Sequence, residues 1–434
     1  LAGVLFIYGV LLLAYGAAFD LLRAGSTDPA RAPIWCWSLI ALAVGLVFAF
    51  LINVNHASQH RIYRDRLMEV FCAEKEAIKS GEWSAARRAQ SPKGWLIRMV
   101  ERRRPYHLIN TCLVTTDSNK RKFRGRGGDN FILSPLFCGS DATGWARTET
   151  AMRTLSLATA IAVSGAALNA HSGPHGTGLL RNKAYAALLS MLGLNLGYWA
   201  RNPAKYADGK RPLPLMPNLL KPGLAALTGH DLSENGGYVQ LSDGGHFENL
   251  GIYELIRRKV RFLWISDAGQ DLGFGFEDLA NAIERIRTDF GVNIRFRQEP
   301  YDLTHLIPGS AVTENVASEN FAAEYSLARR GYAIGTIEYP DDPPGDHGIV
   351  VYVKSTLTRG LPGDLYGYKK RNADFPHQTT LDQFFDEDQF EAYRELGYRL
   401  SAQLFRDIED LTRMGVRLPP PLKTVADQLS FRPS

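Results

Sequence analysis

Cysteine is scarce in this sequence, and the cysteines that occur form no recognisable site. Four are present among 434 residues, widely spaced and without a Cys-x-x-Cys pair: Cys36, Cys72, Cys112 and Cys138. A structural zinc site or a disulfide framework needs closely spaced or paired cysteines, so neither is indicated. We therefore expect the soluble part of the protein to lie in a reducing compartment.

A large excess of charge of one sign is also missing. The net charge is +5, and no aromatic-basic module or DNA-reading motif accompanies this mild basic excess. We therefore expect no nucleic-acid partner. The hydrophobic content of 45% indicates a globular chain, and the length suffices for one large domain or two ordinary ones.

Charge is absent altogether from two runs near the start of the chain, residues 1–19 and Ile34–Val54. Each approaches the ~20 apolar residues that a helix needs to cross a bilayer. A truncated signal peptide would account for the first run but not the second, and a buried helical hairpin would account for both. We expect a hairpin of two transmembrane helices over residues 1–54.

The basic residues around these runs predict the orientation. The loop at residues 20–33 contains two arginines, whereas the stretch after Val54 soon contains five basic residues: Arg61, Arg64, Arg66, Lys75 and Lys79. Because lysine and arginine are enriched in cytoplasmic loops, the main domain is expected on the cytoplasmic side of the membrane. Residues 55–105 read as a basic juxtamembrane helical segment that anionic lipid would attract, at about 1 kcal/mol per cation. A solvated surface helix is the alternative.

The most informative stretch is an Asp-Gly-Gly turn, Asp243-Gly244-Gly245. A run of β-forming residues precedes it at 238–241, and apolar residues recur at helical spacing from Ile252 onward. This order predicts a strand, a tight turn and a helix, with Asp243 at the carboxyl end of the strand, where open α/β sheets bind their ligands. Asp243 is thus a candidate base, and ordinary turn chemistry is the alternative.

A second acidic residue, Asp267, follows the apolar run 262–265, which predicts a β-α-β unit with two acidic strand ends. We expect Asp267 to cap the next helix. The patterns further predict helices over 155–169, 184–199, 276–290 and 387–411, a hairpin of strands 334–339 and 349–354 at the sheet edge, and a Pro-containing tail over 416–434.

The region around Asp243 resembles the Asp-Gly-Gly region of patatin-like phospholipases, in particular large bacterial membrane-associated members related to cytosolic phospholipases. Other segments resemble the same group in the same order: 60–67, 108–111, 131–136, 160–167 and 375–379. The resemblance spans about residues 55 to 400. It implies that residues 106–415 are the carboxyl-terminal part of an α/β catalytic domain, a sheet flanked by helices.

The resemblance also implies a serine-aspartate dyad acting on a phospholipid or another lipid ester of the membrane, without a cofactor. In this family a serine in a Gly-x-Ser-x-Gly elbow attacks the ester, and the aspartate of Asp-Gly-Gly takes its proton. A serine hydroxyl is a poor nucleophile unless a base lies within about 3 Å of it. The matching residues are Asp243 as general base, with Gly244, Gly245 and Asn249 supporting the turn.

The serine half of the dyad has no clear counterpart. No serine here has glycines two positions before and two after; the nearest is Ser164, in Ala162-Val163-Ser164-Gly165-Ala166. Within this chain Ser164 is therefore the candidate nucleophile. In the family the elbow lies upstream of the membrane segments, and this chain begins with Leu1, so we expect a carboxyl-terminal piece whose serine lies upstream.

Two other functions remain open from the residues alone. A metal-dependent hydrolase could use Asp243, His246, Glu248 and Asp267, because mixed histidine and carboxylate sets suit divalent ions. Alternatively, the chain is a non-catalytic membrane-associated scaffold or an inactive relative.

Overall fold

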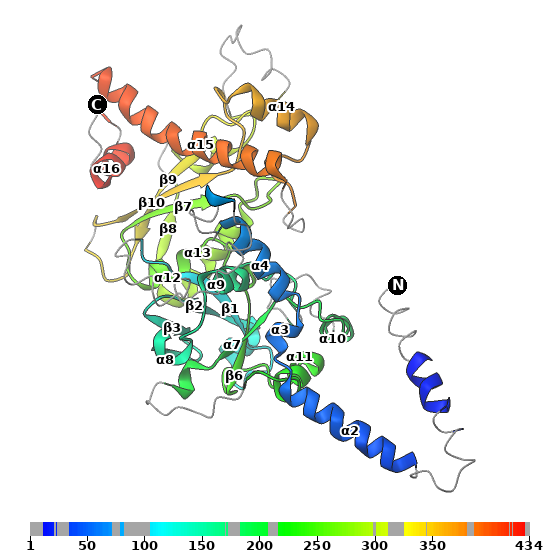
Figure 1. Ribbon diagram of the computed structural model, residues 1–434. Helices are drawn as coiled ribbons and strands as arrows, with labels where there is room; N and C mark the ends of the chain where they lie inside the picture. Colours follow the sequence, from blue (N-terminus) through cyan, green and yellow to red (C-terminus); the bar gives the residue numbers. More distant parts are fainter. Residues whose placement is uncertain are drawn as a thin grey trace. The chain divides into compact units, whose positions relative to one another are not determined.

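The computed structural model shows a chain of helices and two β-sheets (Figure 1). The residues described are 12–20, 23, 34–71, 79–81, 105–169, 171, 183–206, 216–297, 301–310, 325–343, 345–379, 386–415, 417–418 and 420–429. The chain divides into two compact units, Leu1–Phe247 and Glu248–Ser434. The division falls directly after the Asp-Gly-Gly turn.

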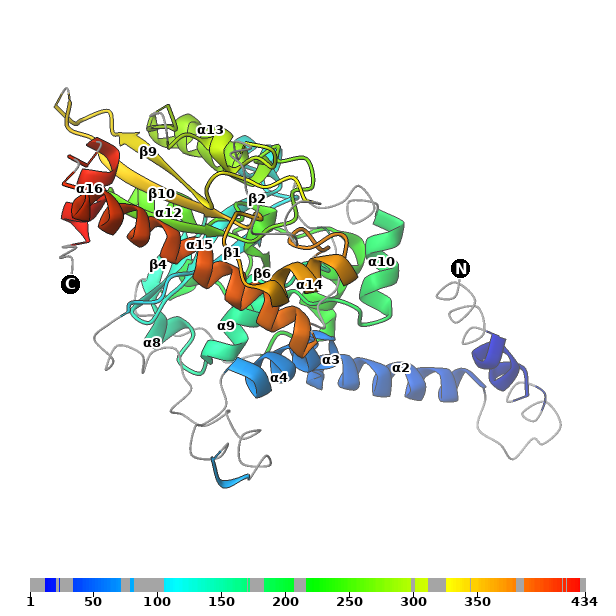
Figure 2. The ribbon, with the colours of Figure 1, turned by 90° about the horizontal axis from the view of Figure 1, so that it is seen from above.

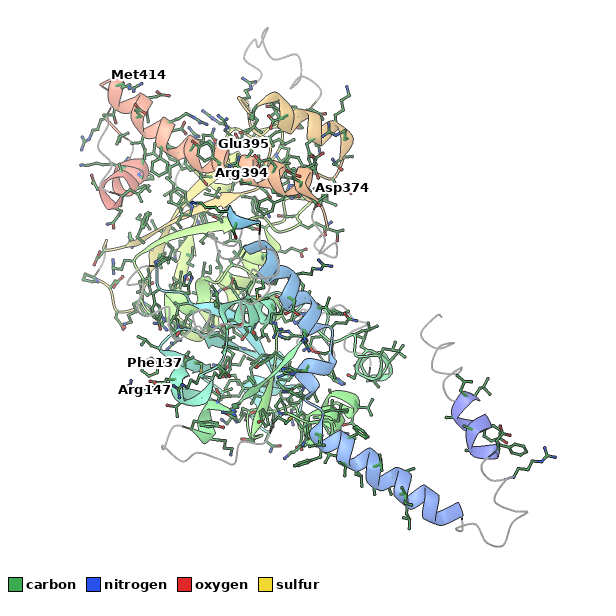
Figure 3. All side chains as sticks on the ribbon, viewed as in Figure 1. Phe137, Arg147, Asp374, Arg394, Glu395 and Met414 are labelled. Atoms are coloured by element: carbon green, nitrogen blue, oxygen red, sulfur yellow. The ribbon has the colours of Figure 1, made fainter. Side chains whose placement is uncertain are left out.

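The first unit contains a six-stranded sheet in the order β4-β3-β2-β1-β6-β5, antiparallel at every neighbouring pair. All six residues of β2 are buried, and β1 and β6 are largely buried in the middle of the sheet. The strands are β1 (Ile109–Val114), β2 (Gly128–Leu133), β3 (Phe137–Ser140), β4 (Gly144–Arg147), β5 (Tyr198–Arg201) and β6 (Tyr238–Asp243). At the β3–β4 edge, the Arg147 guanidinium lies 5.9 Å from the centre of the Phe137 ring (Figure 3).

Helix α9 (Leu157–Ser164) covers this sheet and contacts α4 (His60–Phe71), β1 and β6. Its sequence explains its bounds: the Ser156 hydroxyl accepts a hydrogen bond from the Thr159 amide at 3.0 Å, and Gly165 follows the last turn. The small side chains of α9 allow close packing, since Ala160 and Ala162 are fully buried. The helix predicted over 155–169 is therefore confirmed but shorter.

Several other helices of the first unit are short. The helix predicted over 184–199 is α10 (Lys183–Met191) only, because residues 198–201 instead form β5 beside β6. The others are α3 (Val54–Ala57), α7 (Arg121–Arg126), α8 (Thr148–Ala151), α11 (Leu224–Thr228), and the turns η3 (Pro203–Lys205), η4 (Leu219–Gly223) and η5 (Gly244–His246).

Helix α2 (Ile34–Leu51) occupies most of the second uncharged run, and its exposed side chains from Leu39 to Leu51 are mainly large and apolar. Residues 1–11 of the first run, and residues 72–78 and 82–104 of the basic segment, lie outside the described residues. In the described ranges, no helix combines the length and the apolar character needed for a membrane crossing. The predicted transmembrane hairpin is thus not found there.

The second unit contains a four-stranded sheet in the order β7-β10-β9-β8. Strands β7 and β10 are parallel, and the other neighbours are antiparallel. The strands are β7 (Phe262–Asp267), β8 (Asn293–Arg295), β9 (Tyr332–Glu338) and β10 (Gly348–Lys354). The predicted hairpin is β9–β10, but it forms the centre of the sheet rather than its edge.

The strand-helix-strand order around α12 (Ile252–Arg257) is confirmed, yet β6 and β7 belong to different sheets. The second unit also contains α13 (Glu277–Phe290), η6 (Leu303–Leu306), α14 (Gly363–Arg371), α15 (Glu387–Arg413) and α16 (Pro420–Gln428). The predicted helices over 276–290 and 387–411 are therefore confirmed, and the Pro-containing tail includes α16. The architecture is mixed α/β with mainly antiparallel sheets.

Helix α15 covers β9 and β10 in the second unit (Figure 2). Every fourth residue along one stripe is buried: Ala392, Leu396, Leu400, Leu404 and Ile408. The opposite face is charged, and there Arg394 pairs with Glu391 at 2.6 Å and with Glu395 at 3.0 Å (Figure 3).

Candidate functional site

Asp243 is the last residue of β6, where it pairs in register with Thr111 of β1. The chain then makes the single turn η5, and the Asp243 carboxylate accepts a hydrogen bond from the Gly245 amide at 2.7 Å. A side chain at Gly244 would place its Cβ 2.7 Å from the Asn110 carbonyl oxygen. The first glycine of the motif is therefore required by this close approach of the two backbones.

Burial raises the pKa of Asp243 to about 6, and the hydrogen bond from Gly245 opposes this shift only in part. No cationic side chain among the described residues pairs with the Asp243 carboxylate. The group is thus mainly ionised at neutral pH, while it binds a proton more readily than an ordinary aspartate. These are the properties that a general base requires.

The structure brings Ser164 near the Asp-Gly-Gly turn, through a shared neighbour. The Ser164 hydroxyl donates a hydrogen bond of 2.7 Å to the Asn110 carbonyl, the same oxygen that the Gly244 backbone approaches. No hydrogen bond between described residues joins Ser164 to Asp243. Because a backbone carbonyl cannot act as the base, this arrangement does not activate Ser164 as a nucleophile.

The acidic and histidine side chains proposed for a metal site are engaged elsewhere. His246 Nδ1 lies 3.1 Å from the Ser242 hydroxyl. Glu248 is buried and accepts hydrogen bonds from the amides of Leu250 and Tyr253, so it holds the residues that begin α12. In the described part of the chain, no three histidine, cysteine or carboxylate side chains are gathered so that they could hold a metal ion.

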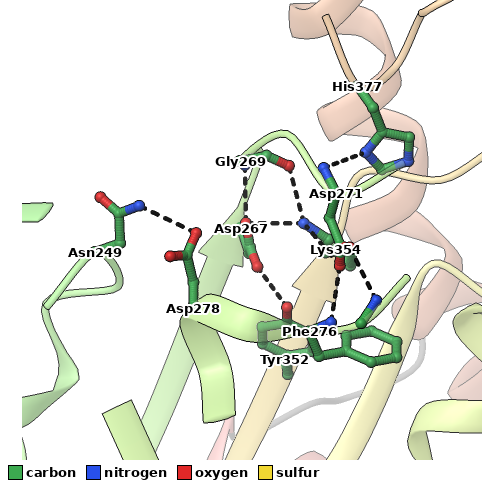
Figure 4. A network of polar contacts seen from close by, with 10 residues as sticks. Asn249, Asp267, Gly269, Asp271, Phe276, Asp278, Tyr352, Lys354 and His377 are labelled. Atoms are coloured by element: carbon green, nitrogen blue, oxygen red, sulfur yellow. Dashed lines mark hydrogen bonds and ion pairs between the residues drawn. The ribbon is translucent and has the colours of Figure 1, made fainter. Parts of the chain in front are cut away.

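Asn249 is exposed and does not anchor the Asp243 turn. Its amide nitrogen donates to the Asp278 carboxylate at 3.0 Å, so it ties the segment after the turn to the first turn of α13 (Figure 4). The anchoring role instead belongs to Gly244, by its contact with Asn110, and to Glu248 for the following helix. The sequence contains a sign of this role of Glu248, because helical spacing begins shortly after it, at Ile252. An acidic residue just before a helix commonly accepts hydrogen bonds from the free amides of the first turn.

The second acidic strand end is neutralised. Asp267 and Lys354 are paired in register at the carboxyl ends of the parallel strands β7 and β10, and Lys354 Nζ lies 3.2 Å from the Asp267 carboxylate (Figure 4). The Tyr352 hydroxyl and the Gly269 amide donate to the same carboxylate at 2.5 and 2.8 Å. The prediction that Asp267 caps the next helix is wrong, because its oxygens are used inside this network.

The loop after β7 is held by neighbouring members of the network. Asp271 accepts hydrogen bonds from the amides of Gly275 and Phe276 at 2.9 and 3.0 Å, and its own amide donates to His377 Nδ1 at 3.3 Å (Figure 4). Burial, together with the charge of Lys354, lowers the pKa of His377 to about 4. His377 is therefore neutral at physiological pH, as an acceptor at Nδ1 requires.

A cavity of about 450 Å³ lies in the first unit and includes Trp199, Met216, Ala225 and Tyr238 in its lining. Tyr238 is the first residue of β6 and Asp243 is the last. At roughly 3.3 Å per residue, the two are about 17 Å apart along the strand. The cavity is therefore distinct from the surroundings of Asp243.

Comparison with known proteins identified no relative of this chain among family models and curated sequences. The resemblance to patatin-like phospholipases accordingly stays a prediction from sequence.

Proposed function

We propose that this chain carries the general base of a membrane-attached, serine-dependent lipid ester hydrolase. Asp243 is the base, and the nucleophilic serine comes from a part of the protein outside these 434 residues. One observation carries the proposal: a strand-end carboxylate that is half-buried, has no cationic partner among the described residues and has its pKa raised to about 6.

The chemistry that this assigns to Asp243 is the uptake and the return of one proton in each half of the reaction. When the serine oxygen attacks the carbonyl carbon of the ester, the Asp243 carboxylate takes the serine proton. The electron pair of the carbon-oxygen double bond moves to the carbonyl oxygen. The tetrahedral intermediate then collapses, the carbon-alkoxide bond breaks, and the protonated Asp243 gives its proton to the departing alcohol. A water molecule releases the acyl group from the serine in the same way.

Membrane attachment is the second part of the proposal, with the bulk of the chain on the cytoplasmic face of the bacterial inner membrane. It is supported by the two uncharged runs and by the large apolar side chains that α2 exposes to solvent. Exposed apolar surface of this extent is unfavourable in water. Extraction of isolated membranes at alkaline pH tests it: the protein should stay in the pellet, and release into the supernatant would contradict it.

The function is tested on the full-length protein with Asp243→Asn, which removes the base and keeps the shape of the side chain. Loss of a general base lowers the rate by roughly 10²- to 10⁴-fold. The matched control is Asp231→Asn, an exposed carboxylate of the same unit, which should leave kcat/KM unchanged. Residual Asp243→Asn activity within about tenfold of the parent would refute the base assignment.

Two further measurements separate the alternatives. Ser164→Ala should retain activity, because the Ser164 hydroxyl is bonded to a backbone carbonyl; complete loss would instead identify Ser164 as the nucleophile. A serine-directed phosphonate should inactivate the enzyme whereas a chelator should not, and the reverse result would favour a metal-dependent hydrolase. If the intact protein hydrolyses no ester at all, the scaffold alternative stands.

A further inference from the structure

Helix α4 carries Tyr63 and packs on α9, the helix that ends at Ser164. Helix α4 is fixed at its first residue, because His60 is buried, with Nδ1 2.9 Å from the Leu196 carbonyl and its ring against Tyr198. Tyr63 lies three residues further, on the same side of the helix. It is half-buried, and its hydroxyl forms no hydrogen bond with any described residue.

The Tyr63 hydroxyl lies against the end of α9. A Cβ at Gly165 would be only 2.8 Å from this hydroxyl oxygen, so the glycine makes the space that the hydroxyl occupies. Gly165 directly follows Ser164, whose own hydroxyl is bonded to the Asn110 carbonyl. Contacts therefore lead from Tyr63, by way of α9, to the strand that pairs with the end of β6.

Asn110 completes the link to Asp243. Its carbonyl contacts the Gly244 backbone, and the next residue, Thr111, is the register partner of Asp243. The side-chain oxygen of Asn110 is buried and has no hydrogen-bond partner in the described part of the chain. Burial, and after it the charge of Asp243, raises the pKa of Tyr63.

We propose that Tyr63 is a further catalytic residue of the Asp243 site, whose hydroxyl donates a hydrogen bond to the alkoxy oxygen of the scissile ester. This inference rests on the proposed function. It adds a group that touches the substrate to a site that otherwise contributes only a base.

The assignment to the alkoxy oxygen follows from the order of proton transfers. Asp243 takes the serine proton and returns it to the departing alkoxide, so the alkoxy oxygen must come within reach of Asp243, and the proposal places it within reach of the Tyr63 hydroxyl as well. As the carbon-alkoxy bond breaks, negative charge grows on that oxygen and the Tyr63 hydrogen bond strengthens. Tyr63 keeps its own proton, because its pKa is raised, and the proton that completes the alcohol comes from Asp243.

This role makes a prediction that depends on the leaving group. The full-length protein and its Tyr63→Phe variant are compared on two esters of the same acyl chain, an alkyl ester and a p-nitrophenyl ester. An alkoxide needs stabilisation to leave, whereas p-nitrophenolate does not. Because a hydrogen bond to a charged group is strong, the variant should lose about 10- to 100-fold in kcat/KM on the alkyl ester and less than about threefold on the p-nitrophenyl ester.

The ratio of the two kcat/KM values is the decisive readout, because it does not depend on the fraction of correctly folded enzyme. Tyr198→Phe is the control, since it removes another hydroxyl from the same unit, and it should leave the ratio unchanged. Gly165→Ala is a second test: its methyl group would displace the Tyr63 hydroxyl and should change the ratio in the same direction.

Three outcomes decide between the inferences. An equal loss on both esters, or no loss, in Tyr63→Phe overturns the role of Tyr63 while leaving Asp243 as the base. Activity that persists on both esters in Asp243→Asn overturns the proposed function itself. A selective loss on the alkyl ester in Tyr63→Phe, with both activities abolished in Asp243→Asn, supports both.

Discussion

Replacement of Lys354 by Met should loosen the core of the second unit, because it leaves a buried carboxylate without its cation. Lys354 and Asp267 are 1% and 5% exposed, and the ammonium lies 3.2 Å from the carboxylate. Removing one partner of a buried ion pair costs about 3–5 kcal/mol. Methionine keeps most of the apolar length of the lysine, so the loss reports mainly the missing charge.

Hydrogen exchange followed by mass spectrometry measures this loss locally. Peptides from β7 and β10 should exchange at least about 100-fold faster in Lys354→Met, because each 1.4 kcal/mol corresponds to a factor of ten in the opening equilibrium. The control is Lys259→Met, which breaks an exposed pair with Asp341 and should change exchange by less than about threefold.

A second substitution tests the reason for the effect. Adding Asp267→Asn removes the stranded charge and keeps an oxygen that accepts from Tyr352, so the double variant should regain most of the lost protection. If Lys354→Met alone raised the exchange rates by less than tenfold, the ion pair of Lys354 with Asp267 would not be what stabilises this core. Failure of the second substitution to restore protection would show that the loss comes from packing.

Three further results are expected. Because Asp243 must be ionised to act and its pKa is about 6, kcat/KM should fall about tenfold per pH unit below pH 6 and level off above it; a flat profile from pH 5 to 8 would contradict the base role. Gly244→Ala should destabilise the first unit by about 1–3 kcal/mol in thermal unfolding, since its Cβ would clash with a carbonyl, whereas Gly237→Ala, in open space, should not. Leu400→Ala should cost about 2–5 kcal/mol, since Leu400 is 1% exposed, and a cost below about 1 kcal/mol would show that the α15 interface collapses around it.

The parts of the fold that local patterns specify were predictable from sequence. The strand, turn and helix around Asp243 follow from alternation, two glycines and helical spacing, and α13 and α15 follow from apolar residues three and four apart. Pairing between distant strands has no such signature. Strand β6 lies between β1 and β5, and nothing in residues 238–243 specifies those neighbours or their antiparallel direction.

The same limit explains the errors at other elements. Residues 198 and 199 were predicted to end a helix, and they belong instead to β5 because β6 offers an unpaired edge, a tertiary effect absent from their own sequence. Tyr63 was part of a segment that resembles the phospholipase family, yet its place beside Gly165 depends on how α4 packs on α9. The resemblance thus singled out the segment, whereas the contact of Tyr63 with Gly165 becomes visible only in the folded chain.

The contrast between Asp243 and Asp267 shows what sequence could not distinguish. Both acids end a β-strand, both are followed by glycine within two residues, and both accept a backbone amide two residues ahead. Asp267 also meets a lysine and a tyrosine from β10, more than 80 residues later, whereas no described cation reaches Asp243. The Asp267 carboxylate, which is paired with a cation, holds the loop after β7. The Asp243 carboxylate, which is half-buried and has no described cation beside it, has a raised pKa and can take a proton. The Ser164 hydroxyl reaches the Asn110 carbonyl that the Gly244 backbone approaches, so a lysine there, in Ser164→Lys, should lower the pKa of Asp243 and shift the acidic limb of the pH–rate profile below pH 6.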